Sequence, residues 1–210
     1  MAKLEYFYSA HSAFAYLGSA RLMQIAGTAG VAIDHKPVAL DRLVAALGAV
    51  GFAQRSPAHV AYYFGRELER WAEHRGVAVM RGLPTHHRKD MTLPNAMLIA
   101  GIRQGHNVDR LAHAMLEAHW RDDADICDRP TLAALAAKAG LTPEPLLAAA
   151  TGPAVLAALE ENTAEAIARS VFGSPTYFVD GDMFYGQDHL ELVERALRQP
   201  YKGVWPRQGR

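Results

Sequence analysis

The sequence predicts an α/β fold in which the two ends of the chain form one sheet and a helical domain is inserted between them. A strand, a helix and a second strand follow one another at the start, as in the front half of a βαβ unit. A two-strand hairpin and a final helix come near the C-terminus and supply the back half. Between these parts, apolar residues recur at helical spacing. The chain has 210 residues and is long enough to bury one sizeable core.

The N-terminal elements follow from apolar runs and from helix start and stop signals. Residues 4–8 (LEYFY) predict the first strand. Ser12 opens a helix whose apolar residues recur at helical spacing until Gly27 and Gly30 end it. Residues 31–38 follow as the second strand.

The middle of the chain predicts a series of helices. They are expected at residues 59–75, 93–104, 108–121, 130–138 and 153–170, with a short additional helix that starts at Thr142-Pro143. Alanine-rich stretches in this region favour close helix packing and argue against a linker. We therefore expect a discontinuous domain of residues 1–40 plus 171–200, an inserted helical domain of residues 41–170, and a surface tail of residues 201–210.

The most specific stretch of the sequence contains the predicted hairpin. Residues 176–179 are rich in β-branched and aromatic side chains, and residues 183–185 form the return strand. The Asp180-Gly181 pair between them favours a type I′ turn. Pro175 stands just before the first of these strands and is a candidate for a cis peptide bond with Ser174.

The last helix is expected to begin directly after the hairpin. Gly186 supplies backbone freedom where the return strand ends, and the helix is predicted over residues 188–197. Asp188 is therefore predicted to be its N-cap, and its carboxylate could also receive an ammonium group of a ligand.

Composition narrows the class of partner. The 22 basic and 22 acidic residues balance, so the chain has no net positive charge that would attract nucleic acid. We therefore expect a small-molecule partner. The single cysteine, Cys127, excludes an internal disulfide and a Cys-x-x-Cys pair, as is typical of a reducing compartment. Lys3 and Glu5 interrupt any apolar run at the start, so we expect no signal peptide and no membrane span. These observations predict a soluble cytoplasmic protein.

Ser12 is the first candidate for chemistry. It stands at the junction of the first strand and first helix, where unpaired N–H groups and the helix dipole favour a bound anion such as a thiolate. The alternative is that Ser12 only caps the helix, which is the common use of serine at such a position. The residues alone leave both interpretations open.

The histidines do not predict a metal site. The polar residues His86 and His87, taken with His113, Glu117 and His119, match no compact ligand motif. Arg88 and Lys89 could instead meet a substrate carboxylate, although a solvated loop is the simpler interpretation. Cys127 has no evident base nearby and is expected to be a packed thiol.

Three stretches together resemble the 2-hydroxychromene-2-carboxylate isomerases, and the resemblance spans nearly the whole chain. These are residues 6–8 with 12–17 (YFY and SAFAYL), residues 67–72 (ELERWA) and residues 171–188 (VFGSPTYFVDGDMFYGQD). That family is grouped with kappa-class glutathione transferases. The resemblance implies a thioredoxin-like fold with an inserted all-helical domain, a homodimer, and an aromatic small-molecule substrate.

The resemblance also implies a cofactor and a set of site residues. The cofactor is glutathione, and the reaction interconverts 2-hydroxychromene-2-carboxylate and trans-o-hydroxybenzylidenepyruvate in aromatic-compound degradation. Ser12 matches the catalytic serine, which lowers the pKa of the glutathione thiol. Ser174, before Pro175, matches the residue whose backbone pairs with the cysteinyl part. Gln187 and Asp188 match the positions that hold the γ-glutamyl end.

The chain departs from the family pattern at three positions. Ala13, Val60 and His189 stand where members commonly have proline, lysine and arginine. Three other functions remain open on this scaffold: a kappa-type transferase that consumes glutathione, a non-catalytic binding protein in which Ser12 is only a cap, and a thiol-disulfide oxidoreductase. The last is disfavoured because Ser12 occupies the position of the attacking cysteine.

Overall fold

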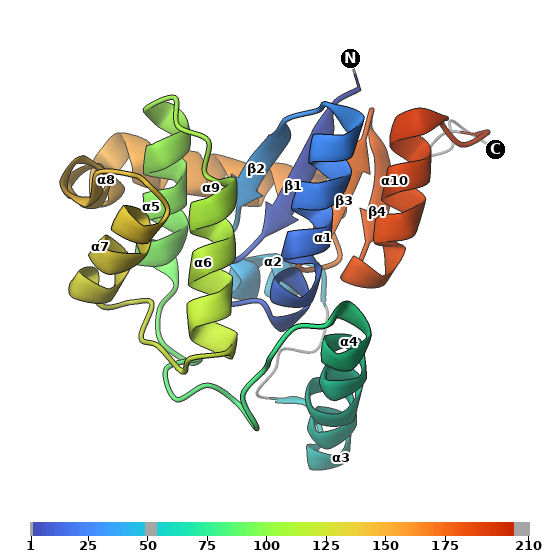
Figure 1. The fold of residues 1–210 in the computed structure, drawn as a ribbon, viewed down its shortest axis with the longest axis horizontal. Coiled ribbons are helices and arrows are strands. Elements are labelled where there is room, and N and C mark those ends of the chain that lie inside the picture. The colour runs from blue at the N-terminus through green and yellow to red at the C-terminus, as the bar shows by residue number, and fades with distance from the viewer. Residues whose placement is uncertain (1, 49–53, 204–210) are drawn as a thin grey trace.

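The computed structural model describes residues 2–48 and 54–203. Both ends of the chain contribute to one four-stranded sheet with the order β2-β1-β3-β4 (Figure 1). Strand β1 (Leu4–Tyr8) runs parallel to β2 (Ile33–Pro37) and antiparallel to β3 (Thr176–Val179). Strand β4 (Asp182–Tyr185) pairs antiparallel with β3 and forms the edge. The predicted shared sheet is therefore confirmed.

The local signals in the sequence fall where they were expected. Helix α1 (Ala13–Ala29) has Ser12 as its N-cap and ends at Gly30, whose φ of 65° is left-handed. Asp180 and Gly181 have φ values of 49° and 89°, and two positive φ values are what a type I′ turn requires.

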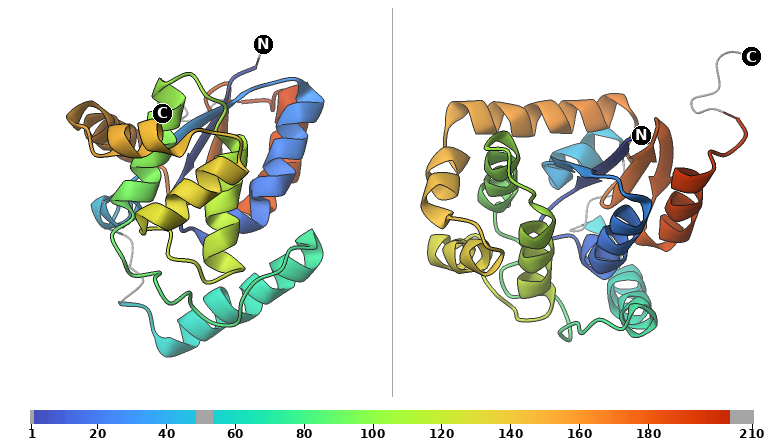
Figure 2. Two further views of the ribbon diagram at one scale, coloured as in Figure 1. Left: turned by 60° about the vertical axis from the view of Figure 1, so that its left-hand side comes forward. Right: turned by 45° about the horizontal axis from the view of Figure 1, so that its top comes forward.

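The two faces of the sheet pack against different helices, because alternate side chains of a strand point to opposite faces. Tyr6 stacks on Tyr8 and Tyr177 on the face covered by α1 and α10 (Leu190–Arg198). Phe7 meets Phe178 edge-on on the other face, which α2 (Leu40–Ala46) and α9 (Pro153–Ala168) cover. Figure 2 shows α9 on one side of the sheet and α1 with α10 on the other.

Four further helices of the insertion lie on the β2 side of the sheet in Figure 1. They are α5 (Thr92–Arg103), α6 (Asp109–Trp120), α7 (Arg129–Lys138) and α8 (Pro143–Ala150). Helix α5 contacts α8, α9 and β2, so the insertion is joined directly to the sheet. Within the described ranges, no helix has both the length and the hydropathy needed to cross a bilayer.

The predicted helix over residues 59–75 is not one regular helix. It consists of α3 (Pro57–Val60), a π-helical segment η2 (Ala61–Arg66) and α4 (Glu67–Arg75). The wider π turn accompanies the placement of Tyr63 and Phe64, which follow one another in sequence, against the same Phe14 ring. This segment lies beyond the end of the sheet where β1 ends and α1 begins (Figure 1).

Gly18 allows α1 to approach the segment that follows β4. A Cβ atom at Gly18 would lie 2.7 Å from Cβ of Gln187 and 3.0 Å from Cδ1 of Leu190. We expect Gly18→Ala to lower the free energy of unfolding by about 1–3 kcal/mol, because backbone or side chains must move apart. Urea denaturation measures this change.

Gly27→Ala is the matched control in the same helix. A Cβ at Gly27 would meet nothing within 4 Å. Because alanine favours helices, this variant should be as stable as the wild type or more stable by up to ~1 kcal/mol. Equal losses in the two variants would contradict the close contact at Gly18.

Candidate active site

Ser12 lies at the N-terminus of α1 with extended backbone angles (φ −73°, ψ 123°). Its Oγ accepts a hydrogen bond from the Ala15 N–H at 3.3 Å, and its hydroxyl donates to the carbonyl oxygen of Ser174 at 3.0 Å. The side chain therefore caps the helix and also connects it to the turn before β3. A hydroxyl at the positive end of a 17-residue helix is well placed to meet an anion.

The turn before β3 contains the cis peptide bond that the sequence identifies as a candidate. The bond between Ser174 and Pro175 is cis. The Ser174 Oγ accepts from the Ser9 N–H at 3.2 Å, and the Pro175 carbonyl accepts from the Gly186 N–H at 2.9 Å. Within the described part of the chain, the N–H of Ser174 has no hydrogen-bond partner. Ser12, Ser174 and Pro175 are thus brought together.

The prediction that Asp188 caps the last helix is wrong. A 3₁₀ turn, η3 (Gln187–His189), comes first, and α10 begins only at Leu190 with no side-chain cap. Gly186 has a φ of 95°, and the Asp188 carboxylate lies over it, so close that a Cβ there would clash with Oδ1. The Asp188 side chain is therefore exposed beside the turn instead of bonded to the helix.

Gln187 is buried and held by a residue that sequence reasoning missed. Arg75, at the end of α4, donates from Nε to Oε1 of Gln187 at 3.0 Å and from a terminal nitrogen to its carbonyl at 2.9 Å. Arg75 also pairs with Glu191 at 2.7 Å. Among the described residues, Nε2 of Gln187 is buried without a hydrogen-bond partner. The α4 helix therefore fixes the position of η3.

A second residue that sequence reasoning missed holds the loop before Ser12. Asn95 of α5 is only 1% exposed. Its Oδ1 accepts from the Ala10 N–H at 2.9 Å, and its Nδ2 donates to Ser9 Oγ at 3.1 Å and to the Val38 carbonyl at 3.2 Å. The only signal in the sequence is a single amide within the apolar central part of the helix.

Aromatic side chains from α1 and η2 pack together near the start of α1. The ring of Phe14 is 5.0 Å from that of Tyr63 and 6.2 Å from that of Phe64. The pKa of Tyr63 is raised by burial and by the nearby Tyr185 and Asp188, so η2 also reaches the hairpin side of the site. A hollow of about 220 Å³ adjoins this group between η2, α4 and residues 79–82, with Phe64 in its lining.

Three imidazoles, one of them from the residue before Ser12, gather in a cluster. The His11 ring lies 4.9 Å from that of His87, and His87 stacks on His119 with Nδ1 and Nε2 3.0 Å apart. Trp120 meets the edge of His87 and donates from Nε1 to the His11 carbonyl at 2.7 Å. This histidine cluster (His11, His87 and His119) was not predicted, because its members are far apart in the sequence.

Burial keeps the histidine cluster neutral. It lowers the pKa of His11 to about 3, with smaller contributions from His87 and His119. It also lowers the pKa values of His87 and His119 to about 4. Nearby ionisable groups also affect the pKa values of His87 and His119. These groups are Arg88, His86, Asp123 and Asp125.

His113, Glu117 and Cys127, which the sequence also singled out, have structural partners. His113 meets Ser19 Oγ at 2.7 Å, and Glu117 pairs with Arg121 at 2.5 Å. Over residues 2–48 and 54–203, no three His, Cys, Asp or Glu side chains are arranged to hold a metal ion. Cys127 donates to the Asp90 carbonyl, and burial raises its thiol pKa to about 11, so it is a poor nucleophile.

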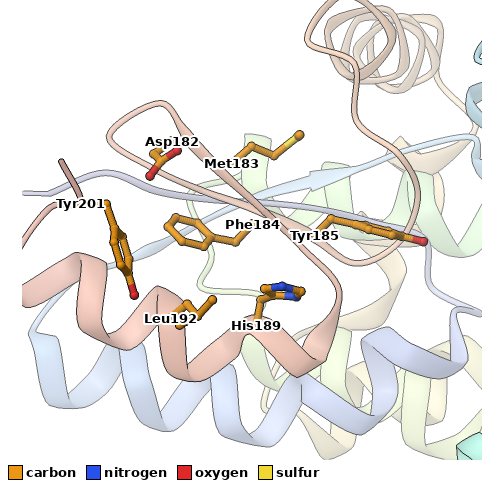
Figure 3. Close-up of a pocket in the computed structure, with 7 residues that line it drawn as sticks. All are labelled: Asp182, Met183, Phe184, Tyr185, His189, Leu192 and Tyr201. Carbon is orange, nitrogen blue, oxygen red and sulfur yellow. The ribbon is translucent and has the colours of Figure 1, made fainter. Parts of the chain in front are cut away.

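A larger hollow of about 410 Å³ lies on the outer side of β4 and α10. Figure 3 shows that Phe184 and Tyr201 face one another there, with Leu192 below them on α10 and His189 nearby. None of the predicted site residues lines it. The arrangement around Ser12 is therefore the candidate active site.

Comparisons with known proteins agree with this geometry. A family model described as the DSBA-like thioredoxin domain matches residues 3–198. The 2-hydroxychromene-2-carboxylate isomerase of Pseudomonas putida is 27% identical over 198 residues, covering 92% of this chain and 93% of that protein. A protein of the same name from Sphingobium xenophagum is 25% identical over 201 residues, covering 92% and 97%.

A solved structure of a 2-hydroxychromene-2-carboxylate isomerase superposes with a TM-score of 0.78 at 25% identity. The match covers 93% of this chain and 94% of that chain. The resemblance found in the sequence and the thioredoxin-like fold that it implies are both confirmed.

The neutral histidine cluster predicts that stability falls at mildly acidic pH. Between pH 6.5 and about 4, the unfolded chain binds protons at these three histidines and the folded protein does not. Each such proton lowers the free energy of unfolding by up to about 1.4 kcal/mol per pH unit. Urea denaturation should therefore show that the free energy of unfolding falls steeply between pH 7 and pH 5.

The variant His119→Gln should make this pH dependence flatter, since one buried imidazole is removed. His106→Gln changes an exposed histidine between α5 and α6 and is the matched control, which should keep the wild-type slope. A wild-type slope in His119→Gln would show that burial of the cluster does not control acid stability.

Proposed function

Since this chain belongs to the DSBA-like thioredoxin domain family, we propose that it is a glutathione-dependent isomerase of the 2-hydroxychromene-2-carboxylate type. It would interconvert 2-hydroxychromene-2-carboxylate and trans-o-hydroxybenzylidenepyruvate in aromatic-compound degradation. Relatives of that name at 25–27% identity over nearly the full chain support the isomerase activity. The observation that carries the proposal is the Ser12 hydroxyl, which lies at the start of α1 and against the Ser174 backbone.

The residues present fit the cysteinyl part of glutathione. The Ser174 N–H is without a partner in the described part of the chain, and its carbonyl accepts only the movable Ser12 hydroxyl among these residues. A peptide-like segment would pair with both groups of Ser174 in the manner of an added strand. The Ser12 hydroxyl, released from that carbonyl, would then donate to the sulfur.

The γ-glutamyl end has a matching donor and acceptor. Gln187 carries a buried amide N–H group that lacks a partner in the described chain, and Asp188 beside it has an exposed carboxylate. An α-carboxylate would accept from Gln187, and an ammonium group would pair with Asp188. Arg75 keeps both residues in place through its bonds to Gln187.

The helix and the hydroxyl favour the thiolate form at neutral pH, since both stabilise negative charge on sulfur. When bound, glutathione would supply a thiolate that adds reversibly to the conjugated carbon of the open-chain keto acid. The chromene reaches this open form when its ring C–O bond breaks, its hydroxyl group becomes the keto group and the hydroxyl proton passes to the phenol oxygen. While the thiolate is attached, the former double bond would be a single bond that can rotate, with its electron pair on the keto oxygen. Ser12 would hold the sulfur in place, and no net redox change or hydrolysis occurs.

Aromatic neighbours support an aromatic substrate. Phe14, two residues after Ser12, packs with Tyr63 and Phe64, and aromatic rings of this kind can stack on a flat aromatic substrate. Thiol-disulfide exchange is disfavoured because Ser12 stands at the attacking position and Cys127 keeps its proton.

The activity is tested by the absorbance change of 2-hydroxychromene-2-carboxylate with purified protein, with and without glutathione, while free thiol is followed alongside. We expect rapid interconversion that requires glutathione and does not consume it. Loss of thiol in step with substrate would instead indicate a kappa-type transferase. No reaction in either sample would favour a binding protein.

Replacement of Ser12 separates its chemical role from its role as a cap. We expect Ser12→Ala to lower kcat by about 10²-fold or more and to raise the thiol pKa of bound glutathione toward that of free glutathione. The ultraviolet absorbance of the thiolate, followed against pH, measures this pKa. Loss of the cap should also lower the free energy of unfolding by ~1 kcal/mol.

Asp128→Ala is the matched control, because Asp128 caps α7 through a 2.9 Å bond from the Thr131 N–H. This variant should lower the free energy of unfolding by about as much as Ser12→Ala does, and it should leave both kcat and the thiol pKa of bound glutathione unchanged. An unaltered thiol pKa in Ser12→Ala would rule out activation by this hydroxyl.

A further inference from the structure

A chain of hydrogen bonds starts at the backbone of Ala10 and determines how the Asn95 amide is oriented. The Ala10 N–H can only donate, so the Asn95 atom 2.9 Å away is the oxygen, Oδ1. The other end of the amide is then the NH₂ group, which donates to the Val38 carbonyl and to Ser9 Oγ. Ser9 therefore accepts a hydrogen bond from Asn95.

The same chain determines which nitrogen of His11 carries the proton. Ser9 is fully buried, so its own hydroxyl hydrogen needs an acceptor. Among the described residues, the acceptor within reach is Nδ1 of His11, at 2.9 Å. Because Nδ1 accepts, the hydrogen of the neutral imidazole must be on Nε2.

His11, the residue before Ser12 in the chain, is left with its Nε2–H as a donor. The structure gives it no hydrogen bond within residues 2–48 and 54–203, and this nitrogen is not among their buried unpaired atoms. The backbone at His11 is also held, because Trp120 Nε1 donates to its carbonyl. Burial together with His87 and His119 keeps the ring uncharged, so Nε2 remains a neutral donor near neutral pH.

We propose that Nε2–H of His11 donates a hydrogen bond to the substrate's keto oxygen and stabilises the negative charge that develops there. This inference rests on the proposed isomerase function. His11 does not transfer its proton. The electron pair returns to re-form the double bond when the sulfur leaves, and His11 is unchanged. A neutral imidazole N–H held in advance is suited to this task, because it does not need to reorganise as charge develops.

Ser9 is a positioning residue in this arrangement, because it acts through His11. Its hydroxyl selects the tautomer, and Asn95 of the helical insertion selects the direction of that hydroxyl. The insertion therefore contributes to the site through a relay of three hydrogen bonds from Ala10 to His11.

Kinetics of two His11 variants test the proposal. His11→Leu removes the donor and should lower kcat by about 10²–10³-fold with little change in KM or in glutathione affinity. His11→Gln places an amide N–H near the position of Nε2 and should recover part of kcat. His106→Gln is the control and should match the wild type. Equal kcat in His11→Leu and the wild type would overturn the proposal.

Nitrogen NMR of the histidine rings provides a readout that does not depend on activity. We expect His11, identified by its absence in His11→Gln, to be protonated on Nε2 and to remain neutral from pH 8 to pH 5. Its Nε2 resonance should shift when trans-o-hydroxybenzylidenepyruvate is added. Ser9→Ala should allow the form protonated on Nδ1 to appear. The proposal would be overturned if the wild-type ring were protonated on Nδ1, or if its Nε2 resonance did not shift when the keto acid was added.

The two experiments separate this inference from the function on which it rests. A wild-type protein that fails to isomerise the substrate contradicts the proposed function, whatever the NMR result. An active wild type whose rate does not depend on His11 leaves the isomerase in place and removes only the role of His11.

Discussion

The hydrogen bond from Ser12 to the Ser174 carbonyl joins the two regions on which the site depends. One region is the junction of β1 and α1, and the other is the turn before β3, 162 positions later in the chain. They meet because β1 and β3 are neighbours in the sheet, with Phe7 opposite Thr176. The sheet therefore does more than bury a core: its pairing brings a helix N-terminus to the backbone of Ser174, and these are the two features to which we assign the thiol of the proposed cofactor.

The helical insertion contributes to the same site from two directions. Arg75 of α4 reaches the turn after β4 and holds Gln187, while Asn95 of α5 holds the loop at Ser9 and Ala10. Both contacts are buried or partly buried hydrogen bonds to groups that would otherwise lack a partner, and such bonds are costly to lose. The insertion thus supports the two ends of the site while its other helices pack on one another.

The sequence predicts the elements whose cause is local. Ser12 and Gly30 limit α1 as expected, and Asp180-Gly181 makes the predicted turn, because each depends on the preference of one or two residues. The prediction that Asp188 caps the last helix was wrong because a 3₁₀ turn follows the bend at Gly186 and precedes that helix. Arg75, Asn95 and the meeting of His11 with His87 depend on how distant segments pack, and no local preference encodes that.

The histidine cluster explains how opposite requirements can be met within a few residues of Ser12. A thiolate is stabilised by positive charge, but a charged imidazole next to it would hold the sulfur too strongly for an addition that must reverse. Helix α1 supplies only the partial charge of its N-terminus. The cluster is kept neutral by burial, so in the proposed reaction His11 would add a donor for the substrate oxygen without adding charge. Stabilisation would then be divided between sulfur and oxygen, which suits a reversible isomerisation.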